Sequence, residues 1–125
     1  MGSLGNLGKK VRKKFAEVVR EKYTFSPELA YKLLKARDKA FREQLDRMGV
    51  RTDDTKDMAV IRRRMDLMGI SIKTVSEHDD PRDNGIVFFE RGKVVAAISQ
   101  PFIEKGNIVV RRVDPSRILI AAGSA

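Results

Sequence analysis

The sequence predicts one α+β domain over residues 1–125, in which three helices precede a four- to five-stranded, mainly antiparallel sheet. Up to residue 68, apolar residues recur at every third or fourth position, which is typical of amphipathic helices. Beyond residue 69 they alternate or form short continuous runs, which is typical of strands. The separation of helices (residues 7–68) from strands (residues 70–122) favours α+β over α/β, with flexible ends at 1–6 and 123–125.

The first helix is predicted at residues 7–22, where one face is apolar and the other faces are strongly basic. The apolar residues are Leu7, Val11, Phe15, Val18 and Val19. The cations on the other faces are Lys9, Lys10, Arg12, Lys13 and Lys14.

The second helix is predicted at residues 27–48, between a start signal and a stop signal. Ser26 is a good N-cap, Pro27 suits the first helical position, and Glu28 is favoured at the positive end of the helix dipole. Gly49 can adopt the left-handed conformation that ends a helix. The apolar stripe comprises Leu29, Ala30, Leu33, Leu34, Ala40, Phe41, Leu45 and Met48.

A third helix is predicted at residues 53–68, capped by Thr52 or Asp53 and ended by Gly69. Its buried face is predicted to comprise Met58, Ile61, Met65 and Met68. Three consecutive arginines fan over about 200° of such a helix, so they point in different directions. Arg62 and Arg63 lie farthest from the apolar face, while Arg64 lies nearer its edge and is expected to lay its stem along the protein.

Strands are predicted at residues 70–75, at 86–99 as a hairpin turning at Arg91-Gly92, at 107–113 and at 117–121. The runs at 94–98 and 118–122 are apolar without alternation, which implies a sheet covered on both faces. Two explanations stay open. Either a second copy of the chain covers one face or an edge, giving a homo-oligomer, or the first two helices lie on opposite faces.

The formal net charge of +9 is concentrated in the first half of the chain. Residues 1–68 hold 18 Lys and Arg against 10 Asp and Glu, whereas residues 69–125 hold 8 against 7. This asymmetry indicates an anionic partner, which we expect to be nucleic acid before an acidic protein or a membrane surface. The chain has no cysteine, which suits a reducing compartment, and a cytoplasmic location is expected.

Chemistry-bearing motifs are weak, so an enzyme, a metal site and a cofactor are not expected. His78 lies beside Asp79, Asp80 and Asp83 in "SEHDDPRDNG", but the spacing matches no EF-hand loop or zinc His pair. Asp83, Glu90 and Lys93 resemble a nuclease set only superficially, because Glu90 to Lys93 is more simply a hairpin turn. The sequence contains no G-x-S-x-G, G-x-G-x-x-G or phosphate-loop motif.

Association with nucleic acid is therefore the preferred function, through cations of the helical half. The predicted contact residues are Lys9, Lys10, Arg12, Lys13, Lys14, Arg20, Arg62 and Arg63. A winged helix-turn-helix is not favoured, because the second helix is long and both the loop at 76–85 and the start of the third helix are acidic. The alternative is a protein-interaction or assembly subunit that uses its sheet faces and edges; a membrane surface is not expected, because the apolar face of the first helix is modest.

Overall fold

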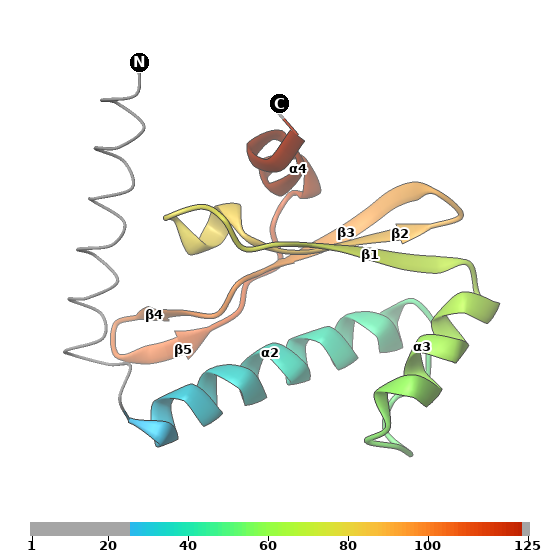
Figure 1. The fold of residues 1–125 in the computed structure, drawn as a ribbon, viewed down its shortest axis with the longest axis horizontal. Coiled ribbons are helices and arrows are strands. Elements are labelled where there is room, and N and C mark those ends of the chain that lie inside the picture. The colour runs from blue at the N-terminus through green and yellow to red at the C-terminus, as the bar shows by residue number, and fades with distance from the viewer. Residues whose placement is uncertain (1–25, 124–125) are drawn as a thin grey trace. The chain divides into compact units, whose positions relative to one another are not determined.

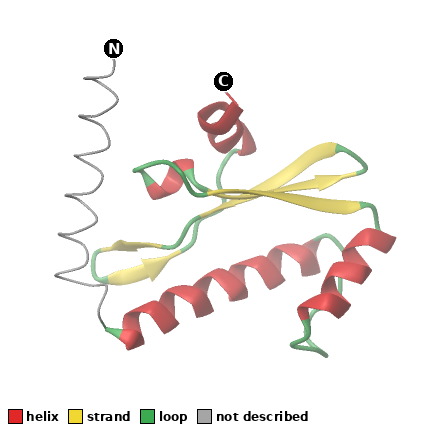
Figure 2. Ribbon diagram, viewed as in Figure 1, coloured by secondary structure: helices red, strands yellow, loops and turns green. Residues whose placement is uncertain are grey.

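The computed structural model describes residues 26–123 and shows an α+β fold. In this part of the chain, helices precede a mainly antiparallel arrangement of three plus two strands, and a further helix follows the strands (Figures 1 and 2). The chain divides into two compact units after Leu34, and the strands, α3 and α4 all belong to the second unit. The helix predicted at 7–22 lies outside the described residues.

Helix α2 spans Pro27–Arg47, close to its predicted range. Ser26 begins it as predicted, because its side-chain oxygen accepts a hydrogen bond from the Leu29 amide at 3.3 Å. Gly49 ends it with a φ of 88°, the left-handed conformation that glycine adopts without strain.

Helix α3 is shorter than predicted and spans Met58–Leu67. Its N-cap is Asp57, whose carboxylate accepts from the Ala59 amide at 2.9 Å. The predicted caps, Thr52 and Asp53, lie instead in a ten-residue connection that is held by side chains of both helices. The prediction was wrong here because that connection is fixed by tertiary hydrogen bonds, which a local pattern does not reveal.

The main sheet has three antiparallel strands in the order β1-β2-β3: Ile70–Val75, Gly85–Glu90 and Lys93–Ser99. These ranges confirm the predicted first strand and hairpin. Arg91 and Gly92 form the turn, and both have a positive φ, 51° and 78°, as a two-residue hairpin turn of type I′ requires. A short 3₁₀ helix, η2 (Pro81–Asp83), lies in the connection between β1 and β2.

The segment after the main sheet first forms a separate hairpin of β4 (Phe102–Glu104) and β5 (Asn107–Val109). The chain then returns to the outer edge of β3. There the Ser99 amide donates to the Arg111 carbonyl at 2.8 Å, and the Val113 amide donates to the Ala97 carbonyl at 3.1 Å. The predicted strand at 107–113 is therefore the short strand β5 and, beyond it, an isolated bridge between Arg112 and Ile98 of β3.

The last predicted strand, at 117–121, is wrong: this segment belongs to helix α4, Pro115–Gly123. Asp114 begins the helix, since its carboxylate accepts from both the amide and the hydroxyl of Ser116, at 2.9 and 2.8 Å. Pro115 suits the first turn. A short apolar run fits a buried helix as well as a strand, so the capping residues decided the outcome.

Helices cover both faces of the sheet, which explains the apolar runs without a second copy at this point (Figure 1). On one face Ile86, Phe88, Ala96 and Ile98 pack with buried residues of α2 and α3; the helix residues are Phe41, Leu45, Ile61 and Met65. On the other face Val75, Val87 and Ala97 pack with Ile118 of α4. One explanation drawn from the sequence placed the first two helices on opposite faces of the sheet. In the described residues, α2 and α3 instead share one face and α4 covers the other.

The close packing of β2 on β3 depends on one glycine. Gly85 has a φ of 147°, and a Cβ atom there would lie 1.9 Å from the carbonyl oxygen of Ile98. Any side chain at this position would force the two strands apart, at the point where both faces of the sheet are buried.

Candidate nucleic-acid interface

The connection between α2 and α3 is organised by one arginine of α2. Arg42 donates from Nε to Asp38 at 2.9 Å and from Nη1 to the carbonyl oxygens of Thr52 and Thr55, both at 2.8 Å. The Thr52 hydroxyl, which is buried, donates to Asp46 at 3.0 Å. The guanidinium of Arg42 therefore satisfies two backbone acceptors and fixes the loop that positions α3.

A second arginine closes the same loop from α3. Arg64 forms a two-pronged pair with Asp54, with N–O distances of 2.7 and 2.9 Å, and donates to the Arg51 carbonyl at 2.9 Å. The hydrogen bond from Arg64 lowers the pKa of Asp54 to about 2, so this carboxylate stays charged at all moderate pH values. The expectation that Arg64 lies along the protein is confirmed, as its side chain is only 32% exposed.

The acidic residues that argued against an anion-binding α3 are all engaged locally. Asp53 pairs with Arg51 at 2.9 Å, Asp54 with Arg64, and Asp57 caps α3. Their charges are thus offset by neighbouring guanidinium groups or by the helix dipole. The repulsion that they would exert on a phosphate is correspondingly reduced.

Among the described residues, Arg62 and Arg63 are the cations of α3 without an ion pair. Both are exposed, and neither forms an ion pair with any residue that the structure describes. Ile61 and Met65, on either side of them in sequence, are buried against the sheet, which fixes the helix rotation and turns both arginines outward. The predicted buried face is only half correct, because Met58 and Met68 are 44% and 39% exposed.

The hairpin turn lies next to the end of α3 and adds cations there. The Arg91 amide donates to the carbonyl oxygen of Gly69 at 2.8 Å, so the turn is joined to the residue that follows the helix. Arg91 and Lys93 are exposed and form no ion pair among the described residues. Sequence reasoning did not include them, because their proximity to α3 depends on the β1–β2 register.

A shallow groove of about 740 Å³ runs beside the α2–α3 connection but does not suit an anion. Its lining mixes both signs of charge, with three carboxylates among the cations. The residues that line it are Lys35, Asp38, Arg42, Thr52, Asp53, Asp54, Thr55, Lys56 and Met58.

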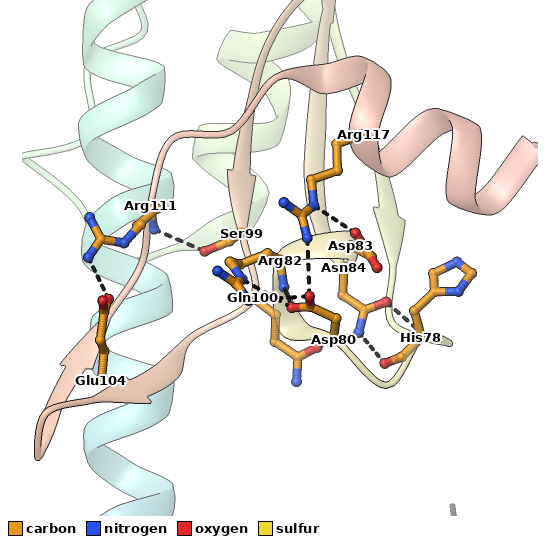
Figure 3. A network of polar contacts seen from close by, with 10 residues as sticks. All are labelled: His78, Asp80, Arg82, Asp83, Asn84, Ser99, Gln100, Glu104, Arg111 and Arg117. Atoms are coloured by element: carbon orange, nitrogen blue, oxygen red, sulfur yellow. Dashed lines mark hydrogen bonds and ion pairs between the residues drawn. The ribbon is translucent and has the colours of Figure 1, made fainter.

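The acidic loop between β1 and β2 is a structural connection in which Asp80 and Asp83 are paired with arginines (Figure 3). Arg117 of α4 bonds Asp83 at 2.7 Å and Asp80 at 3.1 Å, and Arg82 also bonds Asp80. The hydrogen bond from the Arg82 amide, followed by those of its side chain, lowers the pKa of Asp80. Arg117 thereby ties α4 to η2.

Buried Asn84 closes this loop. Its side chain accepts from the His78 amide at 2.9 Å and donates to the His78 carbonyl and to Gln100, at 2.6 and 2.9 Å. The His78 ring points away from Asp80 and Asp83 in Figure 3, and its buried Nε2 has no partner among the described residues. Within those residues, no group of three or more His, Asp or Glu side chains is arranged to hold a metal ion.

The three residues compared with a nuclease set do not converge. Glu90 and Lys93 face each other across the hairpin turn at one end of β2. Asp83 precedes the other end of this strand, about 17 Å away for a six-residue strand.

Of the residues predicted to contact nucleic acid, only Arg62 and Arg63 lie in the described part of the chain, and both are on the outer face of α3. The others, Lys9, Lys10, Arg12, Lys13, Lys14 and Arg20, lie outside it. Over the described range, 26–123, the sequence holds 19 Lys and Arg against 15 Asp and Glu. Residues 1–25 hold 7 against 2, so more than half of the net charge lies there.

Comparisons with protein-family models, with curated proteins and with solved structures found no match. Among residues 26–123, no helix is long and apolar enough to cross a membrane.

Proposed function

We propose that the protein is a non-enzymatic, basic nucleic-acid-associated domain that holds phosphates with Arg62, Arg63 and the cations of residues 1–25. The observation that carries this proposal is the state of the arginines on α3. Arg64 is ion-paired with Asp54, whereas Arg62 and Arg63 are exposed and form no ion pair with any described residue. Exposed guanidinium groups are well suited to phosphate oxygens, which they can bind through two hydrogen bonds.

The expected mode of binding is dominated by phosphate contacts and is largely independent of sequence. Aromatic residues make up only 6% of the chain and tryptophan is absent, so base stacking has few candidates. The connection between α2 and α3, residues 48–57, is longer than the three or four residues of a helix-turn-helix, which speaks against sequence-specific insertion of α3 in a groove. Neutralising several phosphates gives affinity that falls steeply with salt.

The test is a binding titration of the full chain against fluorescent duplex and single-stranded DNA and RNA of about 20 nucleotides over a salt series. Binding at low salt with a negative slope of log K against log salt, about 0.9 per neutralised phosphate on duplex DNA, is the expected result. A Lys9/Lys10/Lys13/Lys14→Ala variant is expected to lose most of the affinity. Absence of binding to all four probes at low salt would overturn the proposal.

The second candidate is a protein-interaction or assembly subunit, and one observation favours it. The outer edge of β1 has no partner strand in the described part of the chain, and open edges recruit strands of other chains. This function would give no salt-dependent nucleic-acid binding, so the same titration separates the two.

A further inference from the structure

The register of the main sheet shows which backbone groups of β1 point outward. The Arg91 amide donates to Gly69 O, and these residues lie opposite each other in the register that pairs Ile70 with Glu90. In an antiparallel ladder, hydrogen-bonded and non-hydrogen-bonded pairs alternate. The next residues along β1 that direct N–H and C=O away from β2 are therefore Ile70, Ile72 and Thr74.

These outward groups are unpaired in the part of the chain that the structure describes. β1 is the first strand of the sheet order β1-β2-β3, and no described residue donates to or accepts from its outer edge. The side chain of Ile72, at the middle of this edge, is 40% exposed. An exposed apolar side chain between free amide and carbonyl groups is a template for another strand.

We propose that two copies of the chain pair through β1, antiparallel, about a two-fold axis at Ile72, and form one continuous six-stranded sheet. The strand itself favours a second copy as the occupant. With Ile72 opposite its own copy, Ile70 lies opposite Thr74 and Ser71 opposite Lys73. Each residue whose N–H and C=O point away from β2 then lies opposite another such residue of the second copy. Each of these pairs can exchange two hydrogen bonds.

No other symmetric register serves this strand as well. A two-fold at Lys73 or Ser71 would pair only two of the three outward-pointing residues with each other and leave the third opposite a residue outside the strand, and at Lys73 it would also oppose two like charges. A two-fold at Thr74 would leave only residues 73–75 of each strand paired with β1 of the second copy, and a two-fold at Ile70 would leave only Ile70. The register at Ile72 gives apolar contact at its centre and a serine hydroxyl beside each lysine.

Because this axis is perpendicular to the sheet, each face continues into the same face of the second copy. In each copy α2 and α3 cover one face and α4 the other. Both α3 helices therefore lie on one side of the joined sheet. The pairing itself rests on the β1 register alone and does not depend on nucleic-acid binding.

Cysteine cross-linking of the full chain tests this register, because the native sequence has no cysteine. The Cα atoms of a hydrogen-bonded antiparallel pair are about 5.5 Å apart, within the 4.4–6.8 Å that disulfides span. Ile72→Cys is therefore expected to give a covalent dimer under mild oxidation without nucleic acid. Thr74→Cys is the matched control on the same edge and face. In the proposed dimer the two copies of residue 74 are roughly 13 Å apart, so this variant is expected to give at least tenfold less covalent dimer.

Equal yields from the two cysteine variants, or none from either, would overturn the proposal. So would protection of the Ile72→Cys thiol from alkylation in a monomeric protein, because another segment of the same chain would then cover the edge.

Light scattering of the native chain gives an independent measure, with twice the 14.1 kDa mass of one chain expected at high micromolar concentration. Ile72→Pro is expected to reduce this mass to that of one chain. Its amide points away from β2, so proline removes the outward donor while the β1–β2 ladder stays intact. A native chain that stays monomeric, or an Ile72→Pro variant that stays dimeric with unchanged circular dichroism, would contradict the proposal.

Discussion

The α2–α3 connection and the outer face of α3 both carry arginines, but the two regions differ in what those arginines bind. In the connection, Arg42 and Arg64 donate hydrogen bonds to a carboxylate and to backbone carbonyls of the loop at residues 51–55. On the outer face, Arg62 and Arg63 are exposed and form no ion pair with a described residue. Neighbouring arginines of α3 thus differ: Arg64 is bonded within the fold, whereas Arg62 and Arg63 are exposed.

The net charge of such a domain is therefore a poor guide to which of its cations remain exposed. An arginine that satisfies buried or half-buried acceptors is held in place and is not available to a phosphate. A free arginine contributes little to stability and keeps its donors for a ligand. The comparison therefore predicts opposite outcomes for substitutions that remove the same charge.

The largest expected loss of stability comes from Arg42→Ala. It leaves the carbonyl oxygens of Thr52 and Thr55 without their donor and is expected to lower the free energy of unfolding by about 1–3 kcal/mol. Urea unfolding measures this change. Arg62→Ala is the control and is expected to stay within about 0.5 kcal/mol of the native chain; equal losses would show that Arg42 has no special role.

A smaller loss is expected from Arg64→Ala than from Arg42→Ala. It removes the two-pronged pair with Asp54 and the bond to the Arg51 carbonyl, both at half-exposed positions. The adjacent Arg63→Ala variant removes the same charge from the same helix turn and is expected to leave the urea midpoint unchanged. If the two variants unfold at the same midpoint, the proposed division between them is wrong.

The smallest stability effect is a dependence on pH that comes from Asp54. The hydrogen bond from Arg64 lowers the pKa of this group from 3.8 to about 2, so the unfolded chain binds the proton more tightly. The stability contributed by the pair is complete above about pH 5 and is lost as pH falls from 3.8 through 2. The stability difference between native protein and Asp54→Asn is therefore expected to be constant at neutral pH and to shrink on acidification; a difference that grows below pH 4 would contradict this assignment.

Much of the fold follows from local sequence signals. Alternation in residues 70–75 and the Arg91-Gly92 turn predicted β1 and the hairpin, and Ser26 and Gly49 marked the ends of α2. The strand predicted at 117–121 is a helix instead, because a short apolar run fits either structure and the Asp114 cap favours the helix. The predicted start of α3 is wrong because the Thr52 hydroxyl donates to Asp46 instead of capping the helix. This hydrogen bond is a tertiary contact.

The candidate site was predictable to the extent that it depends on helix geometry. The rotation of about 100° per residue of a helix correctly predicted that the Arg64 side chain is less exposed than those of Arg62 and Arg63. It did not reveal that the acids preceding α3 are paired with Arg51 and Arg64, nor that Arg91 lies beside Gly69. The contacts of Arg64 and Arg91 join residues ten or more positions apart, so no local pattern encodes them.

Phosphate binding by Arg62 and Arg63 is tested most directly with two double variants that remove equal charge, Arg62→Ala/Arg63→Ala and Arg111→Ala/Arg112→Ala. The second pair is also adjacent and exposed, but it lies on the segment that follows β5. In a salt titration against a 20-nucleotide duplex, the α3 variant is expected to bind about tenfold or more weakly than the native chain and to reduce the slope of log K against log salt by about 2. The control variant is expected to keep the native slope. Equal losses in the two variants, or none in the α3 variant, would contradict the assignment of Arg62 and Arg63 to phosphate binding.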